Sequence, residues 1–194
     1  MSYRLEGLRI LIVDDNAHIR QLLRTILHAV DIPSIDAVED GVAGFASFCR
    51  LEYDIVFTDF EMEPISGLDL VDMIRTSRKS PNPYVPVIMI SSYSDEERVQ
   101  RARDRGVTEF LAKPFTVDVL MARLQSVIEE PRPFVKTDSY FGPDRRRKQD
   151  PRYSGPERRK TQLEKVDVSV RDLSAQQRNA LEESRANVAK IAGD

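Results

Sequence analysis

A short run of large apolar residues that ends in a carboxylate places the strongest constraint on the fold. Ile55, Val56 and Phe57 are β-branched or aromatic, and Asp59 follows them after one threonine. A continuous apolar run of this length is typical of a strand buried on both faces of a parallel sheet. In open α/β sheets the ligand crevice lies beyond the carboxyl ends of the strands. The sequence therefore predicts either a reactive acid at position 59 or an aspartate that only caps the next turn.

Three further apolar runs also end at polar residues. Strands are expected over 8–13, 85–90 and 108–112, and they are followed by Asp14 and Asp15, by Ser91, and by Lys113. Two adjacent carboxylates repel each other, so the acid pair indicates a bound cation. Asp15 or Asn16 also fits the N-cap of a helix. Each run thus stops at a residue suited to a phosphoryl group and a divalent metal.

Helical spacing of apolar residues separates the predicted strands. Helices are expected over 16–30, after Gly41, after Gly67, and over 95–106 and 116–130, with a weaker edge strand over 34–38. Val117 and Val119 are among the residues expected in the core. Strands that alternate with helices form right-handed βαβ units. We therefore predict an α/β fold, a doubly wound five-stranded parallel sheet with helices on both faces.

Charge divides the chain into two parts. The 29 Lys and Arg and the 32 Asp and Glu give a net charge of −3. Residues 131–165 hold eleven basic and five acidic residues and so carry +6, which leaves −9 for the rest. We place a folded domain over 1–130, a basic linker or tail rich in Pro, Gly and Arg over 131–172, and a short C-terminal helix over 173–194.

The basic segment contains a two-copy repeat. The residues Tyr-Phe-Gly-Pro-Asp-Arg-Arg-Arg at 140–147 correspond to Tyr-Ser-Gly-Pro-Glu-Arg-Arg-Lys at 153–160. Because this composition cannot build a core, the default expectation is a mostly disordered tail. Arginine clusters with interleaved tyrosine also suit nucleic acid, an acidic protein or a cyclic dinucleotide. The candidate residues for such contacts are Arg145, Arg146, Arg147, Arg158 and Arg159.

Cysteine content and hydropathy indicate the compartment. The single cysteine, Cys49, excludes an internal disulfide and fits a reducing cytosol, and its apolar helical setting predicts a core position. No apolar run approaches the ~20 residues of a membrane span, and the first residues contain no apolar signal region. We therefore expect a cytoplasmic protein without membrane contact.

The order and spacing of the polar strand ends resemble the receiver domain of two-component response regulators, over residues 8–130. The resemblance implies the flavodoxin-like strand order 2-1-3-4-5, Mg²⁺ as cofactor, and a histidine kinase or histidine phosphotransfer protein as partner. It implies that Asp59 is the phosphoacceptor. It assigns metal binding to Asp14, Asp15, Asp59 and the backbone carbonyl of Glu61, and phosphoryl contact and switching to Ser91, Lys113 and Phe110. Glu61 and Tyr93 border the path of the hydrolytic water in the family, so both are expected to tune the lifetime of the phosphoryl group.

Three classes of function fit these residues. We expect a phosphorylated signalling module, not an enzyme, that acts on an unknown downstream protein through its fourth and fifth helices. A DNA- or cyclic-dinucleotide-binding regulator that acts through the tail is the alternative, although no helix-turn-helix pattern favours nucleic acid. An Asp-nucleophile phosphatase of the haloacid dehalogenase type is disfavoured, because it needs a second aspartate where this chain has Glu61.

Overall fold

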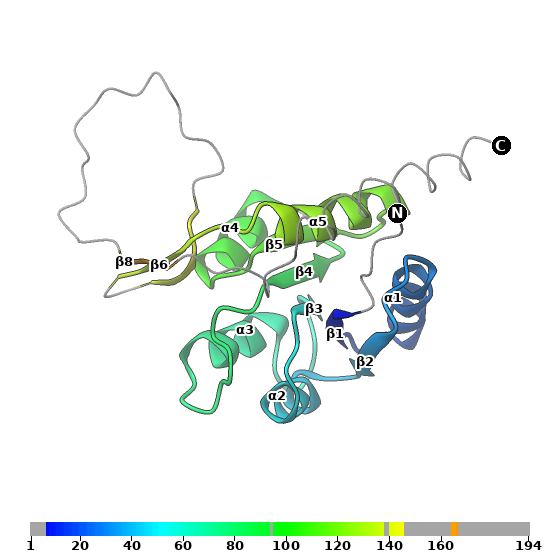
Figure 1. The fold of residues 1–194 in the computed structure, drawn as a ribbon, viewed down its shortest axis with the longest axis horizontal. Coiled ribbons are helices and arrows are strands. Elements are labelled where there is room, and N and C mark those ends of the chain that lie inside the picture. Colours follow the sequence, from blue (N-terminus) through cyan, green and yellow to red (C-terminus); the bar gives the residue numbers. More distant parts are fainter. Residues whose placement is uncertain (1–6, 94, 138–139, 146–163, 167–194) are drawn as a thin grey trace, which may run out of the picture.

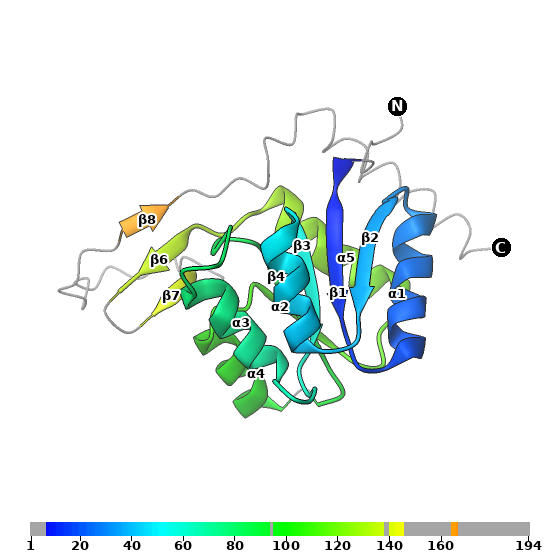
Figure 2. The ribbon, with the colours of Figure 1, turned by 90° about the horizontal axis from the view of Figure 1, so that it is seen from below.

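The computed structural model describes residues 7–93, 95–137, 140–145 and 164–166. Its main part is a parallel sheet with helices packed on both faces (Figure 1, Figure 2). The strands are β1 (Arg9–Val13), β2 (Ser34–Val38), β3 (Ile55–Asp59), β4 (Val87–Ser91) and β5 (Glu109–Ala112). The helices are α1 (Ala17–Ala29), α2 (Gly41–Arg50), α3 (Gly67–Thr76), α4 (Glu96–Asp104) and α5 (Val117–Glu129). The strand order β2-β1-β3-β4-β5 confirms the predicted fold class.

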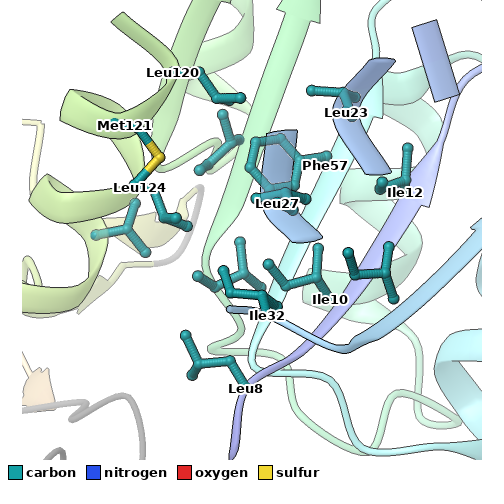
Figure 3. Packing of buried hydrophobic residues seen from close by; sticks show 14 of the residues in the cluster. Leu8, Ile10, Ile12, Leu23, Leu27, Ile32, Phe57, Leu120, Met121 and Leu124 are labelled. Atoms are coloured by element: carbon teal, nitrogen blue, oxygen red, sulfur yellow. The ribbon is translucent and has the colours of Figure 1, made fainter. Parts of the chain in front are cut away.

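Two hydrophobic clusters fill the space between the sheet and its helices. One cluster joins α1 and α5 to the residues of β1 and β3 that point to their side, and it includes Ile10, Ile12, Leu27, Phe57 and Leu124 (Figure 3). The other joins α2, α3 and Ala102 of α4 to the alternate strand residues, such as Leu11, Val13 and Val56. Because side chains alternate along a strand, one five-residue strand serves both clusters. Both faces of the central strands are therefore buried.

Three residues expected in the core lie at the surface instead. Val117 and Val119 are 39% and 42% exposed, and Cys49 is also exposed. The buried stripe of α5 begins at Leu120, and Val119 lies about 100° from it around the helix. Within the described ranges, no helix has the length and hydropathy needed to cross a membrane.

Residues 131–145, which the sequence places in a basic tail, contain two strands that pack on the domain. β6 (Phe134–Lys136) pairs antiparallel with β7 (Phe141–Pro143) on one side and with β8 (Glu164–Val166) on the other. Phe134 and Val135 are buried. The folded part therefore continues past Glu130. Four of the candidate tail arginines and the predicted C-terminal helix lie outside the described residues: Arg146, Arg147, Arg158, Arg159 and 173–194.

A buried arginine of α3 joins these strands to the domain. Arg75 donates to the carbonyl oxygen of Gly106 through Nε and Nη2, at 3.1 and 2.9 Å, and to that of Pro83 through Nη1, at 2.8 Å. Burial lowers the pKa of Arg75 to about 9. Its guanidinium lies over the ring of Phe134, 5.1 Å from the centroid. Phe134 therefore covers a buried cation as well as apolar surface.

The described part of the first repeat copy, residues 140–145, also packs on the domain. Arg145 stacks on Tyr140, 3.8 Å from the ring centroid, and forms a 2.7 Å ion pair with Asp104 at the end of α4. A Cβ atom on Gly142 would lie 2.7 Å from the Cα of Gly106, so only glycine permits this approach of two backbones. One of the five candidate arginines, Arg145, is thus engaged within the chain.

Candidate functional site

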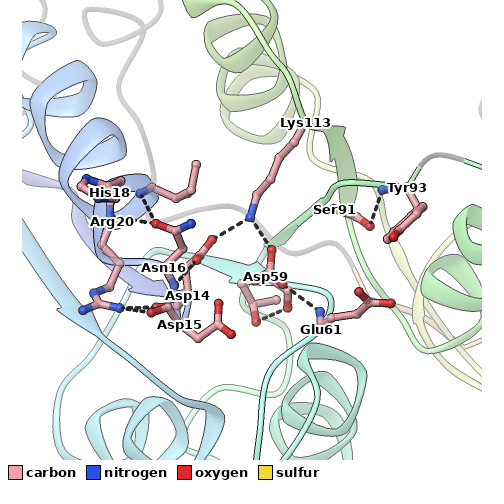
Figure 4. A network of polar contacts seen from close by, with 12 residues as sticks. Asp14, Asp15, Asn16, His18, Arg20, Asp59, Glu61, Ser91, Tyr93 and Lys113 are labelled. Atoms are coloured by element: carbon pink, nitrogen blue, oxygen red, sulfur yellow. Dashed lines mark hydrogen bonds and ion pairs between the residues drawn. The ribbon is translucent and has the colours of Figure 1, made fainter.

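Two carboxylates and one ammonium meet at the carboxyl edge of the sheet. Asp14 follows β1, Asp59 ends β3, and Lys113 follows β5. The Nζ of Lys113 lies 2.5 Å from Oδ1 of Asp59 and 3.1 Å from Oδ2 of Asp14 (Figure 4). Parallel strands bring their carboxyl ends to one edge, so residues far apart in the chain converge there.

The second oxygen of each carboxylate accepts a backbone hydrogen bond from two residues further on. Oδ1 of Asp14 accepts from the N–H of Asn16, and Oδ2 of Asp59 accepts from the N–H of Glu61, both at 2.8 Å. Asn16 in turn caps α1 by accepting from the N–H groups of His18 and Ile19. The side chains of Asp14 and Asp59 are 1% and 9% exposed. Their positions are therefore set by the turns that follow the two strands.

Burial and charge act together on the ionisation of this cluster. Burial raises the pKa of Asp59, and the hydrogen bond and charge of Lys113 offset that rise only in part. Burial alone would lower the pKa of Lys113, but its contacts with Asp59 and Asp14 outweigh burial, so the pKa lies above the usual value. The ammonium therefore stays charged at neutral pH and compensates the two buried acids.

The oxygen-rich donor set suits a hard cation. Within the described part of the chain, no group of three or more His, Cys, Asp and Glu side chains is arranged to hold a metal ion. Mg²⁺, however, is usually bound by one or two carboxylates together with water and phosphate oxygens. The buried pair Asp14 and Asp59 meets that requirement. Asp15 is exposed, and its backbone carbonyl accepts from Arg20 at 3.0 Å.

Two of the predicted switch residues, Ser91 and Phe110, lie outside the contact between Lys113 and the two acids. Ser91, at the end of β4, is 2% exposed, and its hydroxyl accepts from the N–H of Tyr93 at 3.1 Å (Figure 4). The carbonyl oxygen of Ser91 accepts from the N–H of Lys113 at 2.7 Å. Phe110 lies half-buried on β5, against the α2 and α3 cluster. The structure thus brings Asp14, Asp59 and Lys113 into contact and places Ser91 beside Lys113 through the backbone.

Arg98 of α4 also contacts this edge of the sheet. Its Nη1 donates to Oε1 of Glu61 at 2.5 Å, and its guanidinium lies over the ring of Tyr93, 4.3 Å from the centroid. Helical periodicity gives no sign of this contact. The one feature of the sequence that could have indicated it is the position of Arg98 in the first turn of the helix that follows Ser91, close to the strand end.

Gly67 allows α3 to begin directly beneath the end of β3. A Cβ atom at this position would clash with the carbonyl oxygen of Asp59, at a distance of 1.8 Å. Replacing Gly67 by alanine should therefore displace the strand end and lower the free energy of unfolding by about 3 kcal/mol. Urea unfolding measures this loss. Gly7→Ala is the control, because the space around Gly7 is open, and equal midpoints for the two variants would contradict the prediction.

Comparison with known proteins identifies the family. Residues 10–125 match the family described as the response regulator receiver domain. The chain belongs to this family. Two curated relatives of the receiver are chemotaxis proteins. The chain is 28% identical to chemotaxis protein CheY-3 of Vibrio cholerae, over 64% of this chain and 94% of the relative, and 30% identical to the probable chemotaxis protein CheY of Rhizobium etli, over 63% and 93%.

Solved structures agree with this receiver fold. Chemotaxis response regulator CheY4 of Vibrio cholerae superposes with a TM-score of 0.57 at 26% identity and covers 62% of this chain and 98% of that one. The receiver domain of the histidine kinase CKI1 from Arabidopsis thaliana, solved with Mg²⁺ and BeF₃⁻, gives a TM-score of 0.54 at 22% identity, over 61% and 90%. The resemblance to a two-component receiver is therefore confirmed, with a histidine kinase as the general class of partner.

Proposed function

We propose that the receiver accepts a phosphoryl group on Asp59 from a histidine kinase or a histidine phosphotransfer protein, and that it signals by binding a downstream protein. The position of Asp59 carries the proposal. Its carboxylate is buried at the carboxyl end of the central strand, and it contacts Lys113 beside a second acid, Asp14. A structural aspartate that only caps a turn needs neither partner. The receiver acts as a signalling module, and its chemistry is limited to its own phosphorylation and dephosphorylation.

The transfer begins when a carboxylate oxygen of Asp59 attacks the phosphorus atom of a phosphohistidine. A P–O bond forms to Asp59, the P–N bond breaks, and the imidazole nitrogen keeps the electron pair and takes up a proton. Lys113 supplies positive charge to a phosphoryl oxygen. Ser91 donates its hydroxyl hydrogen to another phosphoryl oxygen.

Asp14 and Asp59 would hold Mg²⁺, with Asp15 and the backbone carbonyl of Glu61 as the further candidate ligands. A divalent cation held there would supply positive charge that offsets the repulsion between the carboxylate and the phosphoryl group. The N–H groups of Asn16 and Glu61 each bind one oxygen of the two carboxylates, and the other oxygen of each contacts Nζ of Lys113. Lys113 would then neutralise part of the charge of the phosphoryl group.

We place the surface that binds the downstream protein on the face formed by α4, β5 and α5. A groove of about 430 Å³ lies there, and Phe110 lines it together with Val99, Arg103, Val119 and Arg123. Phosphorylation of Asp59 would draw the hydroxyl of Ser91 inward, and the space it leaves would allow Phe110 to move. A downstream protein that binds the groove would then sense the phosphoryl group.

Labelling with acetyl phosphate tests the function directly. The wild-type chain should become phosphorylated in the presence of Mg²⁺ and should stay unlabelled when a chelator is present from the start, because the charge of Lys113 alone would not offset the approach of two anions. Intact-mass measurement follows the added phosphoryl group. Failure to label the chain in the presence of Mg²⁺ would refute the proposal.

The side chain at position 93 should control how long the phosphoryl group lasts. Tyr93 lies two residues after Ser91, and its ring is large and exposed at the edge of the site. Tyr93→Ala should raise the rate of dephosphorylation about threefold, which corresponds to ~0.7 kcal/mol in the barrier, because water gains access. Tyr93→Phe is the matched control and should decay at the wild-type rate. Equal decay of Tyr93→Ala and wild type would count against this role.

A further inference from the structure

Arg98 links the two positions that flank the phosphoacceptor site. Glu61 lies two residues after Asp59, and Tyr93 lies two residues after Ser91. The guanidinium of Arg98 donates to the carboxylate of Glu61 at 2.5 Å and stacks on the ring of Tyr93 at 4.3 Å. A single side chain of α4 therefore joins the loop after β3 to the loop after β4.

The orientation of Arg98 is set by its own helix. Asp95 caps α4 by accepting from the N–H of Arg98 at 3.0 Å, and its other oxygen lies 3.4 Å from Nε of the same residue. The ring of Phe60 packs against the guanidinium, with 5.4 Å to the centroid. A planar guanidinium can bind a carboxylate along its edge while its face stacks on an aromatic ring, which an ammonium cannot do. Arginine thus suits these four neighbours, Glu61, Asp95, Phe60 and Tyr93, better than lysine.

We propose that Arg98 is a positioning residue that holds Glu61 and Tyr93 together as a cover over the phosphoryl group and so slows its hydrolysis. This inference rests on the proposed phosphorylation of Asp59. In hydrolysis a water oxygen attacks phosphorus, the P–O bond to Asp59 breaks, and inorganic phosphate leaves while the Asp59 carboxylate is restored. The attacking water must lose a proton. The carboxylate of Glu61 could orient that water and accept the proton, and its ion pair with Arg98 restricts its turning toward the water.

Loss of Arg98 therefore has two consequences for the same step. The freed carboxylate of Glu61 becomes available to orient and deprotonate water, and the unheld ring of Tyr93 opens the path to phosphorus. The contact is exposed to solvent, so its free energy is that of a surface ion pair supplemented by ring stacking. This predicts that Arg98→Gln dephosphorylates roughly two to five times faster than wild type.

The decay of phosphorylated Asp59 after removal of acetyl phosphate tests this role, with Mg²⁺ held constant. Arg98→Lys should decay at a rate between wild type and Arg98→Gln, because it keeps the charge and loses the stacking. The double variant Arg98→Gln with Glu61→Gln should decay more slowly than Arg98→Gln alone. Raising the salt from about 0.1 M to about 1 M should accelerate decay more in wild type than in Arg98→Gln, since only wild type has the exposed Arg98–Glu61 pair to be screened.

Arg101→Gln is the matched control, because Arg101 is an exposed arginine of the same helix and its loss changes the net charge equally. Its phosphoryl group should decay at the wild-type rate. Wild-type decay of Arg98→Gln, or equal acceleration by Arg101→Gln, would overturn the role of Arg98 while leaving the phosphorylation of Asp59 intact. A wild-type chain that takes up no phosphoryl group would overturn both.

Discussion

Replacing Asp59 by asparagine should reduce acid-labile phosphoryl labelling to background. The amide has no anionic oxygen to attack phosphorus, and the other buried carboxylate that contacts Lys113, Asp14, is the one assigned to the metal. Labelling by acetyl phosphate with Mg²⁺, followed by mass spectrometry, gives the stoichiometry. Asp118→Asn is the control, because Asp118 is an exposed acid on α5 and should be labelled like wild type.

The same substitution should not unfold the protein. Burial raises the folded-state pKa of Asp59, so the stability that the protonated group contributes is present at acid pH and is lost as the pH rises through that folded pKa. Once the carboxylate is ionised, its burial therefore lowers the free energy of unfolding of the metal-free protein, and a neutral amide at this position removes that cost. Thermal melting at pH 7 without metal should show Asp59→Asn to be at least as stable as wild type. Persistent labelling of this folded variant would rule out Asp59 as the phosphoacceptor.

Phe134→Ala should destabilise the chain by about 3–5 kcal/mol, although Phe134 lies beyond the boundary that the sequence suggests. Its ring is 3% exposed and lies 5.3 Å from Tyr84 and 5.6 Å from Phe141 between centroids. The substitution leaves a cavity and uncovers one face of the buried Arg75 guanidinium. The midpoint and slope of urea unfolding measure the loss.

Lys136→Ala provides the matched control for this prediction. Lys136 lies on the same strand, β6, and is exposed, so its truncation should leave the midpoint unchanged within about 0.5 kcal/mol. A chain that ends at Glu130 should lose at least as much stability as Phe134→Ala, because it removes Phe134 and Phe141 together. If that shortened chain unfolds at the wild-type midpoint, β6 and β7 contribute nothing to the fold.

The contact between Asp14, Asp59 and Lys113 could be anticipated because it depends on few geometric facts. Each residue directly follows or ends an apolar run, and parallel strands align their carboxyl ends. Lys113 reaches Asp14 across 99 positions of sequence. Such a contact needs only the correct strand order, which the alternation of helices and strands restricts to a small number of topologies.

The strands β6 and β7 could not be anticipated from the pattern of their residues. Each has three residues, too few to show a period of two, and they lie among prolines and arginines that indicate a solvated chain. Their partners are Arg75 and Tyr84, which lie in a helix and a loop without local relation to them. Burial of an aromatic ring on a distant surface outweighs local composition, and local composition is all that a sequence window contains.

The amino-acid sequence by itself determined the α/β class and placed Asp14, Asp59 and Lys113 at strand ends, because period, strand length and polar strand ends are local properties; the role of phosphoacceptor for Asp59 came from the resemblance to receivers. Only the tertiary structure decided where residues 140–145 pack and that Arg98 joins Glu61 to Tyr93, 37 and 5 positions away in sequence. Each of those contacts joins side chains from different elements of the fold. They form because the elements pack closely together, and no local pattern in the sequence records that packing.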